Sequence, residues 1–151
     1  MKKIFLLLFA AMLTFSGCDI HTTKIINGPE MYTDYITARG DSNGSINKNW
    51  KTSGNPGNQG CYVYQEFAFN EITRNVIKNG AVMVYLVDAD GRDNALPYIH
   101  SFDDRPDIVT ENIRCEVEKG LLTIIVTWNN FETYTITEDL KFKVCILNPE
   151  E

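Results

Sequence analysis

Residues 112–128 read Asn-Ile-Arg-Cys-Glu-Val-Glu-Lys-Gly-Leu-Leu-Thr-Ile-Ile-Val-Thr-Trp. From 112 to 118 every second side chain is apolar, which is the period of a half-buried strand. Lys119-Gly120 then supplies a tight connection, and residues 121–128 are again strongly β-forming. The stretch therefore predicts an antiparallel hairpin with one face in a protein core.

The same pattern recurs along the chain and predicts a mostly β protein. Segments 61–69 and 140–146 also alternate, and the continuous apolar run 81–87 suits a central strand covered on both sides. Residues 96–102 form a further strand, with Pro97 favouring an edge position. Shorter strands are expected within residues 35–38 and 46–51.

One short helix is expected between segments 61–69 and 81–87. Ile72, Val76 and Ile77 share a helical face, with Asn70 as the N-cap and Asn79-Gly80 as the stop. About six to eight strands with antiparallel connections and a single helix predict a two-layer antiparallel β-sandwich of immunoglobulin-like size. The helix is expected to cross over at an edge or end of the sandwich.

The first 17 residues predict a signal peptide. Lys2 and Lys3 precede an apolar run over residues 4–15, and Ser16-Gly17-Cys18 follows it. A helix that crosses a bilayer needs about 20 apolar residues, so this run is too short to remain as an anchor.

Phe15-Ser16-Gly17-Cys18 resembles the bacterial lipobox, in which a cysteine receives diacylglycerol and becomes the first residue of the mature protein. Leu is commonest in that motif where Phe15 stands, and an ordinary secretory signal is the alternative. Acyl chains contribute about 0.8 kcal/mol per buried methylene, so two or three of them anchor a protein firmly. We therefore expect lipidation of Cys18, a tether over residues 18–30 and a single domain over residues 31–151.

The part of the chain after cleavage is acidic. Loss of Lys2 and Lys3 leaves 12 basic against 20 acidic side chains, which moves the formal net charge from −6 to −8. Nucleic acids and anionic lipid faces require clusters of Lys or Arg, and the sequence contains none. We expect no nucleic-acid partner, and a membrane contact through the lipid alone. The expected location is the cell envelope, with the outer membrane or cell surface ahead of the inner membrane.

Three cysteines remain once Cys18 carries lipid, so at most one disulfide can form. Alternation places Cys61 and Cys115 on apolar faces, which makes them the favoured pair if any pair is bridged. Buried free thiols that act as small hydrophobic side chains are the alternative.

Six stretches between Tyr62 and Leu147 look familiar together: Phe67, Glu71-Ile72-Thr73, residues 80–87, Leu96-Pro97-Tyr98, residues 124–128 and residues 140–144. In these residues the chain resembles a group of small lipoproteins of uncharacterised function that are common in gut-dwelling Gram-negative bacteria. The resemblance implies a lipid-linked tail that leads into a β domain, and it carries no active-site residue.

Tyr62 and Tyr64 are the candidate ligand contacts. They are expected on the strand face opposite Val63 and Phe67, where two neighbouring rings stack on sugars or anchor a protein partner.

Two short motifs offer weaker candidates. Arg39-Gly40-Asp41 spells the tripeptide that integrins read, although such matches are common by chance and Gly40 also serves to turn the chain. Asp88, Asp90 and Asp93 supply the oxygen ligands that calcium prefers, although a polar turn at Asp90-Gly91 explains the same residues. The acidic segment 103–107 is expected to be a solvated loop.

No catalytic arrangement is predicted. His100 is the one histidine outside the tether, and on its strand it shares a face with Leu96, Tyr98 and Phe102, which indicates a structural role. We expect no cofactor and no enzyme activity. The sequence favours a lipid-anchored binding or presentation module for a protein or a glycan, with a structural or accessory subunit of an envelope complex as the alternative.

Overall fold

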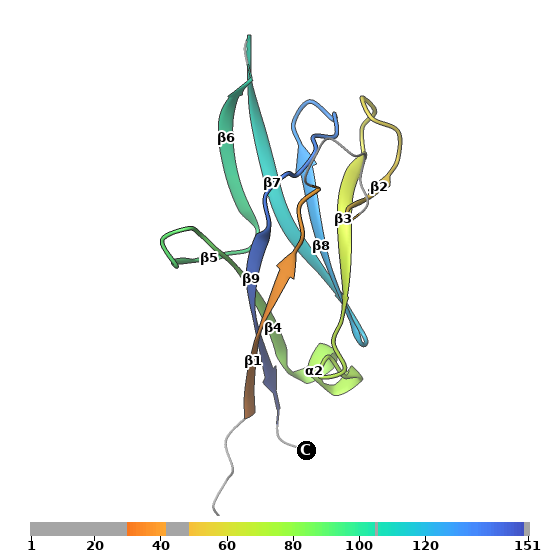
Figure 1. Ribbon diagram of the computed structural model, residues 1–151. Helices are drawn as coiled ribbons and strands as arrows, with labels where there is room; N and C mark the ends of the chain where they lie inside the picture. The colour runs from red at the N-terminus through yellow and green to blue at the C-terminus, as the bar shows by residue number, and fades with distance from the viewer. Residues whose placement is uncertain (1–29, 42–48, 105, 150–151) are drawn as a thin grey trace, which may run out of the picture.

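The computed structural model describes residues 30–41, 49–104 and 106–149, so the signal peptide, Cys18 and residues 18–29 of the expected tether lie outside the described residues. The described chain forms two antiparallel sheets and one short helix (Figure 1). The predicted β-sandwich is therefore confirmed. No helix in the described ranges has the length and apolar character needed to span a membrane.

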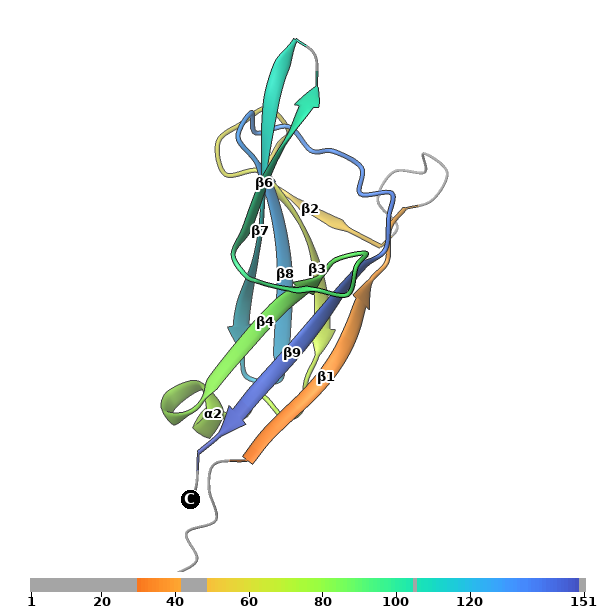
Figure 2. The same ribbon diagram turned by 90° about the vertical axis from the view of Figure 1, so that its left-hand side faces the viewer.

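The four-stranded sheet has the order β1-β9-β4-β5, with every neighbouring pair antiparallel (Figure 2). Its register places Tyr35 and Tyr85 on either side of Lys143 on the outer face. The strands are β1 (Glu30–Ala38), β9 (Leu140–Asn148), β4 (Ala81–Val87) and β5 (Asp93–Ala95).

The five-stranded sheet has the order β2-β3-β8-β7-β6. The predicted hairpin is β7-β8, and Gly120 in its turn has a φ of 76°, a conformation that favours glycine. Strand β6 lies at the sheet edge, as Pro97 indicated. The strands are β2 (Lys51–Ser53), β3 (Tyr62–Ala68), β8 (Leu121–Trp128), β7 (Asp107–Glu118) and β6 (Tyr98–Asp104).

The core lies between the sheets and takes one face of each. Trp50, just before β2, is 1% exposed and packs into it. The largest of the other fully buried side chains in this core are Phe142, Ile72, Ile113, Leu122, Ile124 and Ile146.

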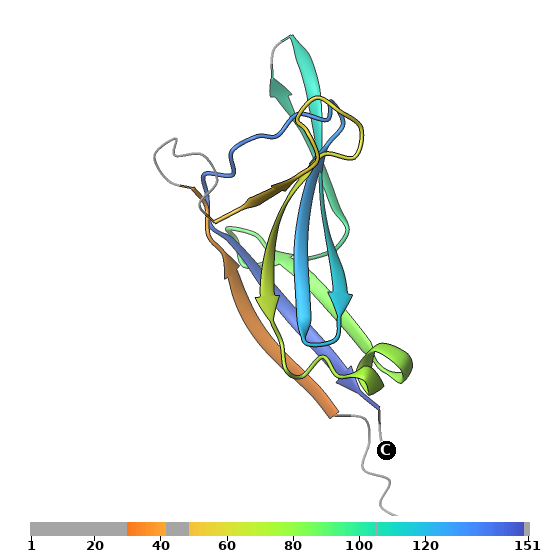
Figure 3. The ribbon, with the colours of Figure 1, turned by 90° about the vertical axis from the view of Figure 1, so that its right-hand side faces the viewer.

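Helix α2 (Arg74–Asn79) connects β3 of one sheet to β4 of the other at one end of the sandwich (Figure 3). The expected crossover is confirmed, but the expected N-cap is wrong. Thr73 caps the helix, because its Oγ1 accepts a hydrogen bond from Val76 N at 3.2 Å. Ile72 is fully buried, and its N–H bonds to Phe69 O, so the chain makes a turn into the core before the helix begins.

Two strand predictions need correction. Residues 81–87 do form an interior strand, but β4 is not covered on both faces, because Met83 on its outer face is 42% exposed. The expected acidic loop is largely strand: Asp103 and Asp104 end β6, and Asp107 begins β7 and pairs with Asp104.

Within the described residues, Cys61, Cys115 and Cys145 are free thiols. Cys115 lies on β7 and pairs with Ile124 of β8, whereas Cys61 immediately precedes β3 on the other side of β8. The proposed Cys61–Cys115 bridge is therefore absent, since a whole strand separates the two. Cys61 and Cys145 are buried, and burial raises the pKa of the Cys115 thiol.

The two ends of the sandwich differ. Strand β1 begins and β9 ends at the same end, beside α2, whereas the β6–β7 hairpin and the β2–β3 connection project at the opposite end (Figure 1). A chain that enters through β1 therefore holds the hairpin end away from its point of entry.

Candidate functional site

Tyr62 and Tyr64 lie side by side on the outer face of β3, as the alternation predicted. Their ring centroids are 5.9 Å apart and the ring planes are tilted by 57°. Both side chains are half-buried, while Val63 between them faces the core and is 1% exposed. The strand therefore presents two adjacent aromatic rings on the outside of the five-stranded sheet.

Charged side chains surround this tyrosine pair. Lys51 of β2 lies over the Tyr64 ring, 5.6 Å from its centroid, and forms an ion pair with Glu66. The hydrogen bond to the Glu66 carboxylate raises the pKa of Lys51. Across β8, Arg114 and Glu116 of β7 form a second ion pair.

Strand β8 separates the tyrosines from the Arg114–Glu116 pair. It contributes Thr123, Ile125 and Thr127 to the outer face, and the register sets Ile125 between Tyr64 and Arg114. Ile125 is 1% exposed, so its long neighbours cover it. The face combines aromatic surface, paired charges and two threonine hydroxyls, so it offers stacking, electrostatic and hydrogen-bonding contacts to a ligand.

The Arg39-Gly40-Asp41 tripeptide is not displayed for a receptor. Asp41 is 4% exposed, its Oδ1 accepts a hydrogen bond from Asn49 N at 3.1 Å, and its N–H donates to Ile136 O. Gly40 packs so closely against the backbone of the 129–139 segment that a Cβ atom would lie 2.4 Å from Thr137 O. The glycine permits a close contact, and the aspartate belongs to the interior.

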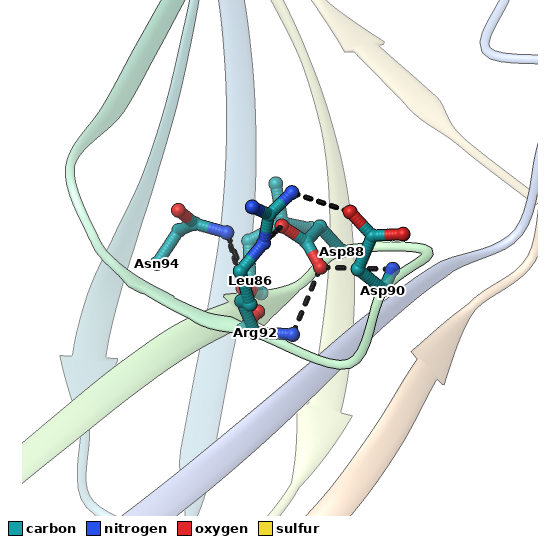
Figure 4. A network of polar contacts seen from close by, with 5 residues as sticks. All are labelled: Leu86, Asp88, Asp90, Arg92 and Asn94. Atoms are coloured by element: carbon teal, nitrogen blue, oxygen red, sulfur yellow. Dashed lines mark hydrogen bonds and ion pairs between the residues drawn. The ribbon is translucent and has the colours of Figure 1, made fainter.

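The calcium candidate is a charged turn between β4 and β5 (Figure 4). Asp88 Oδ1 accepts from the N–H groups of Asp90 and Arg92 at 3.0 and 2.8 Å, and Arg92 Nε lies 2.9 Å from Asp88 Oδ2. The Arg92 guanidinium also pairs with Asp90, and Lys143 pairs with Asp93.

Arg92 and Lys143 therefore supply the positive charge that a calcium ion would otherwise bring to these carboxylates. The hydrogen bond from the Arg92 backbone is the main cause that lowers the pKa of Asp88. No group of three or more His, Cys, Asp or Glu side chains within the described ranges is arranged to hold a metal ion. Residues 88–92 form the polar turn that Asp90-Gly91 indicated: Gly91 N donates a hydrogen bond to Asp88 O at 2.9 Å, and Gly91 has a φ of 80°.

A second cluster lies on the inner face of the five-stranded sheet, where the register aligns His100, Glu111 and Trp128 across three strands. Trp128 Nε1 donates a hydrogen bond to Glu111 Oε2 at 2.9 Å. His100 Nδ1 lies 3.7 Å from Glu111 Oε1, which is beyond hydrogen-bond distance. Burial of this carboxyl raises its pKa, against the opposing effects of His100 and the Trp128 hydrogen bond.

Aromatic rings surround Glu111. Tyr134, from the segment between β8 and β9, packs edge-on against Phe102 and lies 5.4 Å from Trp128 between ring centroids. This segment crosses from one sheet to the other above the core (Figure 3). It forms one wall of an open pocket of about 290 Å³ that is lined by Phe102, Glu111, Trp128, Tyr134, Thr135, Ile136, Thr137, Glu138 and Leu140.

Sequence reasoning placed His100 correctly beside Tyr98 and Phe102, with ring centroids 5.6 and 6.1 Å away, but it missed Glu111. A signal was present. Val109, Glu111 and Ile113 have the same parity on one strand, so a carboxylate occupies an inward position between two apolar residues. Starting the predicted strand at residue 112 hid this pattern.

Comparison of the chain with protein-family models, with curated proteins and with solved structures finds no match.

Proposed function

We propose that this protein is a lipid-anchored binding module of a bacterial cell envelope, without catalytic activity, that presents one face of a β-sandwich to a protein or glycan ligand. The anchor is supported by the lipobox-like sequence that ends at Cys18. The binding role is supported by the aromatic pair on β3 and by its place in the molecule.

The observation that carries the proposal is the position of Tyr62 and Tyr64. Strand β3 begins at the hairpin end of the sandwich, whereas β1 begins at the opposite end (Figure 1). A tether attached ahead of β1 holds the tyrosine pair away from the membrane. Aromatic residues dominate the energetics of many binding surfaces because each ring buries a large area at a small entropic cost.

The experiment replaces single tyrosines with the photo-crosslinking residue p-benzoylphenylalanine, which preserves aromatic character. One variant carries it at Tyr62 and the matched control carries it at Tyr35, which is 53% exposed on the outer face of the other sheet. We expect irradiation of living cells to give a discrete adduct from position 62 and none of that mass from position 35. Identical adducts from both positions, or none from position 62, would contradict a protein-binding face.

A glycan ligand is tested separately with purified protein on an array of envelope and host glycans. We expect the double variant Y62A/Y64A to lose any saturable signal while Y35A retains it. A signal that survives in Y62A/Y64A places the glycan elsewhere on the molecule. Thermal unfolding of each variant shows whether the sandwich is intact.

A further inference from the structure

The pocket beneath the 129–139 segment is acidic and aromatic. Two carboxylates, Glu111 and Glu138, contribute to its lining, and no Lys or Arg does. No cationic side chain in the lining balances these two negative charges. A basic group, the imidazole of His100, lies beside Glu111 and outside the lining.

Glu111 has one oxygen engaged and one available. The indole N–H of Trp128 occupies Oε2, whereas Oε1 faces only His100 Nδ1 at 3.7 Å within the described part of the chain. The Glu111 side chain is only 16% exposed. A carboxylate oxygen of a half-buried side chain that lines a pocket and lacks a hydrogen bond attracts a charged donor.

Hydrogen bonds and ring packing position Tyr134 in the wall of the pocket. The Tyr134 hydroxyl accepts a hydrogen bond from Asn130 at 2.7 Å and donates one to Asp104 at 2.9 Å. Phe102 meets the Tyr134 ring at an interplanar angle of 87°. Aromatic faces attract cations that lie within about 6 Å of the ring centroid, and they do so more strongly where water is excluded.

An organic cation fits this chemistry better than a metal ion or a neutral sugar does. A calcium ion requires about six to eight oxygen ligands, which two carboxylates among aromatic walls do not supply. A neutral sugar would donate hydrogen bonds to the two carboxylates but would leave their charges unbalanced. The volume of about 290 Å³ lies at the lower end of small-molecule sites, which suits a group the size of one side chain.

We propose that this pocket binds an alkylammonium or guanidinium group, with Glu111 as its charge partner and Phe102 and Tyr134 as its aromatic walls. The cation is either a free small amine or the lysine or arginine side chain of a partner protein. The site lies on the inner face of the five-stranded sheet, so it is separate from the tyrosine pair and does not rest on the function proposed above.

The test uses the full chain in its native form, labelled with ¹⁵N-tryptophan. The chain has two tryptophans, so the spectrum shows two indole N–H signals. Trp128 reports on the pocket, and Trp50 lies outside the pocket lining and serves as an internal reference. The probes are ethylguanidinium, n-butylammonium and blocked Gly-Arg-Gly and Gly-Lys-Gly, with ethylurea and methyl glucoside as neutral counterparts.

We expect the cations to shift the Trp128 signal saturably while the Trp50 signal stays in place. The variant E111Q keeps an oxygen for the Trp128 indole but loses the charge, so it should bind the cations about tenfold more weakly. The control E66Q removes the same charge outside the pocket and should bind as the wild type does. Tyr62→Ala should also leave this binding unchanged, which separates the pocket from the outer face.

The two sources of the cation are distinguished by affinity. Tighter binding of Gly-Arg-Gly or Gly-Lys-Gly than of the free cations assigns the pocket to a partner's side chain, and the reverse order assigns it to a small amine.

The proposal is overturned if ethylurea or methyl glucoside shifts Trp128 as strongly as the cations do, or if E111Q binds like the wild type. Absence of a saturable shift at about 10 mM cation, a concentration above the dissociation constant of any useful site, overturns it as well. If E111Q fails to fold, Phe102→Leu provides the second variant, with weaker cation binding expected.

Discussion

Glu111 places a carboxylate on the inner face of the five-stranded sheet, between two buried apolar residues of the same strand. Its neighbours of the same parity on β7, Val109 and Ile113, are each 1% exposed, so the carboxylate occupies a position that the fold reserves for apolar side chains. The partners that compensate it come from adjacent strands, and the sheet register decides which they are. Local sequence showed a charge at an inward position, but the pairing with Trp128 became visible only once β8 was placed beside β7.

The raised pKa of Glu111 predicts a specific pH dependence of stability. The folded protein binds this proton more tightly than the unfolded chain does, since burial disfavours the carboxylate. The contribution of Glu111 to the free energy of unfolding therefore falls as pH rises from the ordinary glutamate pKa, about 4.3, through the higher pKa of the folded state.

The variant E111Q removes this contribution. We expect the free energy of unfolding of E111Q, minus that of the wild type, to increase as pH rises from about 4 to 7. Urea denaturation at a series of pH values measures it, with E116Q on the outer face of the same strand as the control. A difference that is flat, or that decreases with pH, would show that burial does not control this carboxyl.

At the scale of elements, strands were predicted better than the segments between them. The alternation in 61–69, 112–118 and 140–146 correctly identified β3, β7 and β9, because burial of one sheet face imposes a period of two on the sequence. The start of α2 was wrong, since Asn70 and Thr73 are both good caps and only the burial of Ile72 selects between them.

The N-cap of α2 gives a prediction at this scale. Thr73→Ala removes the acceptor for the Val76 N–H and should lower the free energy of unfolding by about 1 kcal/mol, the usual contribution of a cap. Thr73→Ser should retain most of it. Asn70→Ala is the matched control and should change stability by less than about 0.5 kcal/mol. Equal losses from Asn70→Ala and Thr73→Ala in chemical denaturation would contradict the assignment of Thr73.

Over the whole molecule, the sequence predicted the two-layer architecture but not the way the layers bring distant residues together. The tyrosine pair was predictable because Tyr62 and Tyr64 are two residues apart on one strand. The pocket was not, because it joins β6, β7 and β8 to the 129–139 segment, which has no alternating pattern and packs across the top of the core. Sites assembled from four parts of a chain depend on sheet order, which local periodicity does not encode.

The arrangement of the whole molecule also gives the proposed anchor its purpose. Both ends of the described chain lie at one end of the sandwich, and the β6–β7 hairpin lies at the other (Figure 1). A lipid ahead of β1, as proposed, would therefore be attached at the end opposite the hairpin.

Intact mass measurement of the native protein, combined with phase partitioning in Triton X-114, tests the anchored module most directly. The account predicts a chain that begins at Cys18, carries the added mass of diacylglycerol and acyl groups, and enters the detergent phase, whereas Cys18→Ser remains an unacylated precursor. An unmodified thiol at Cys18, cleavage at another residue, or recovery of the wild type in the aqueous phase would contradict it.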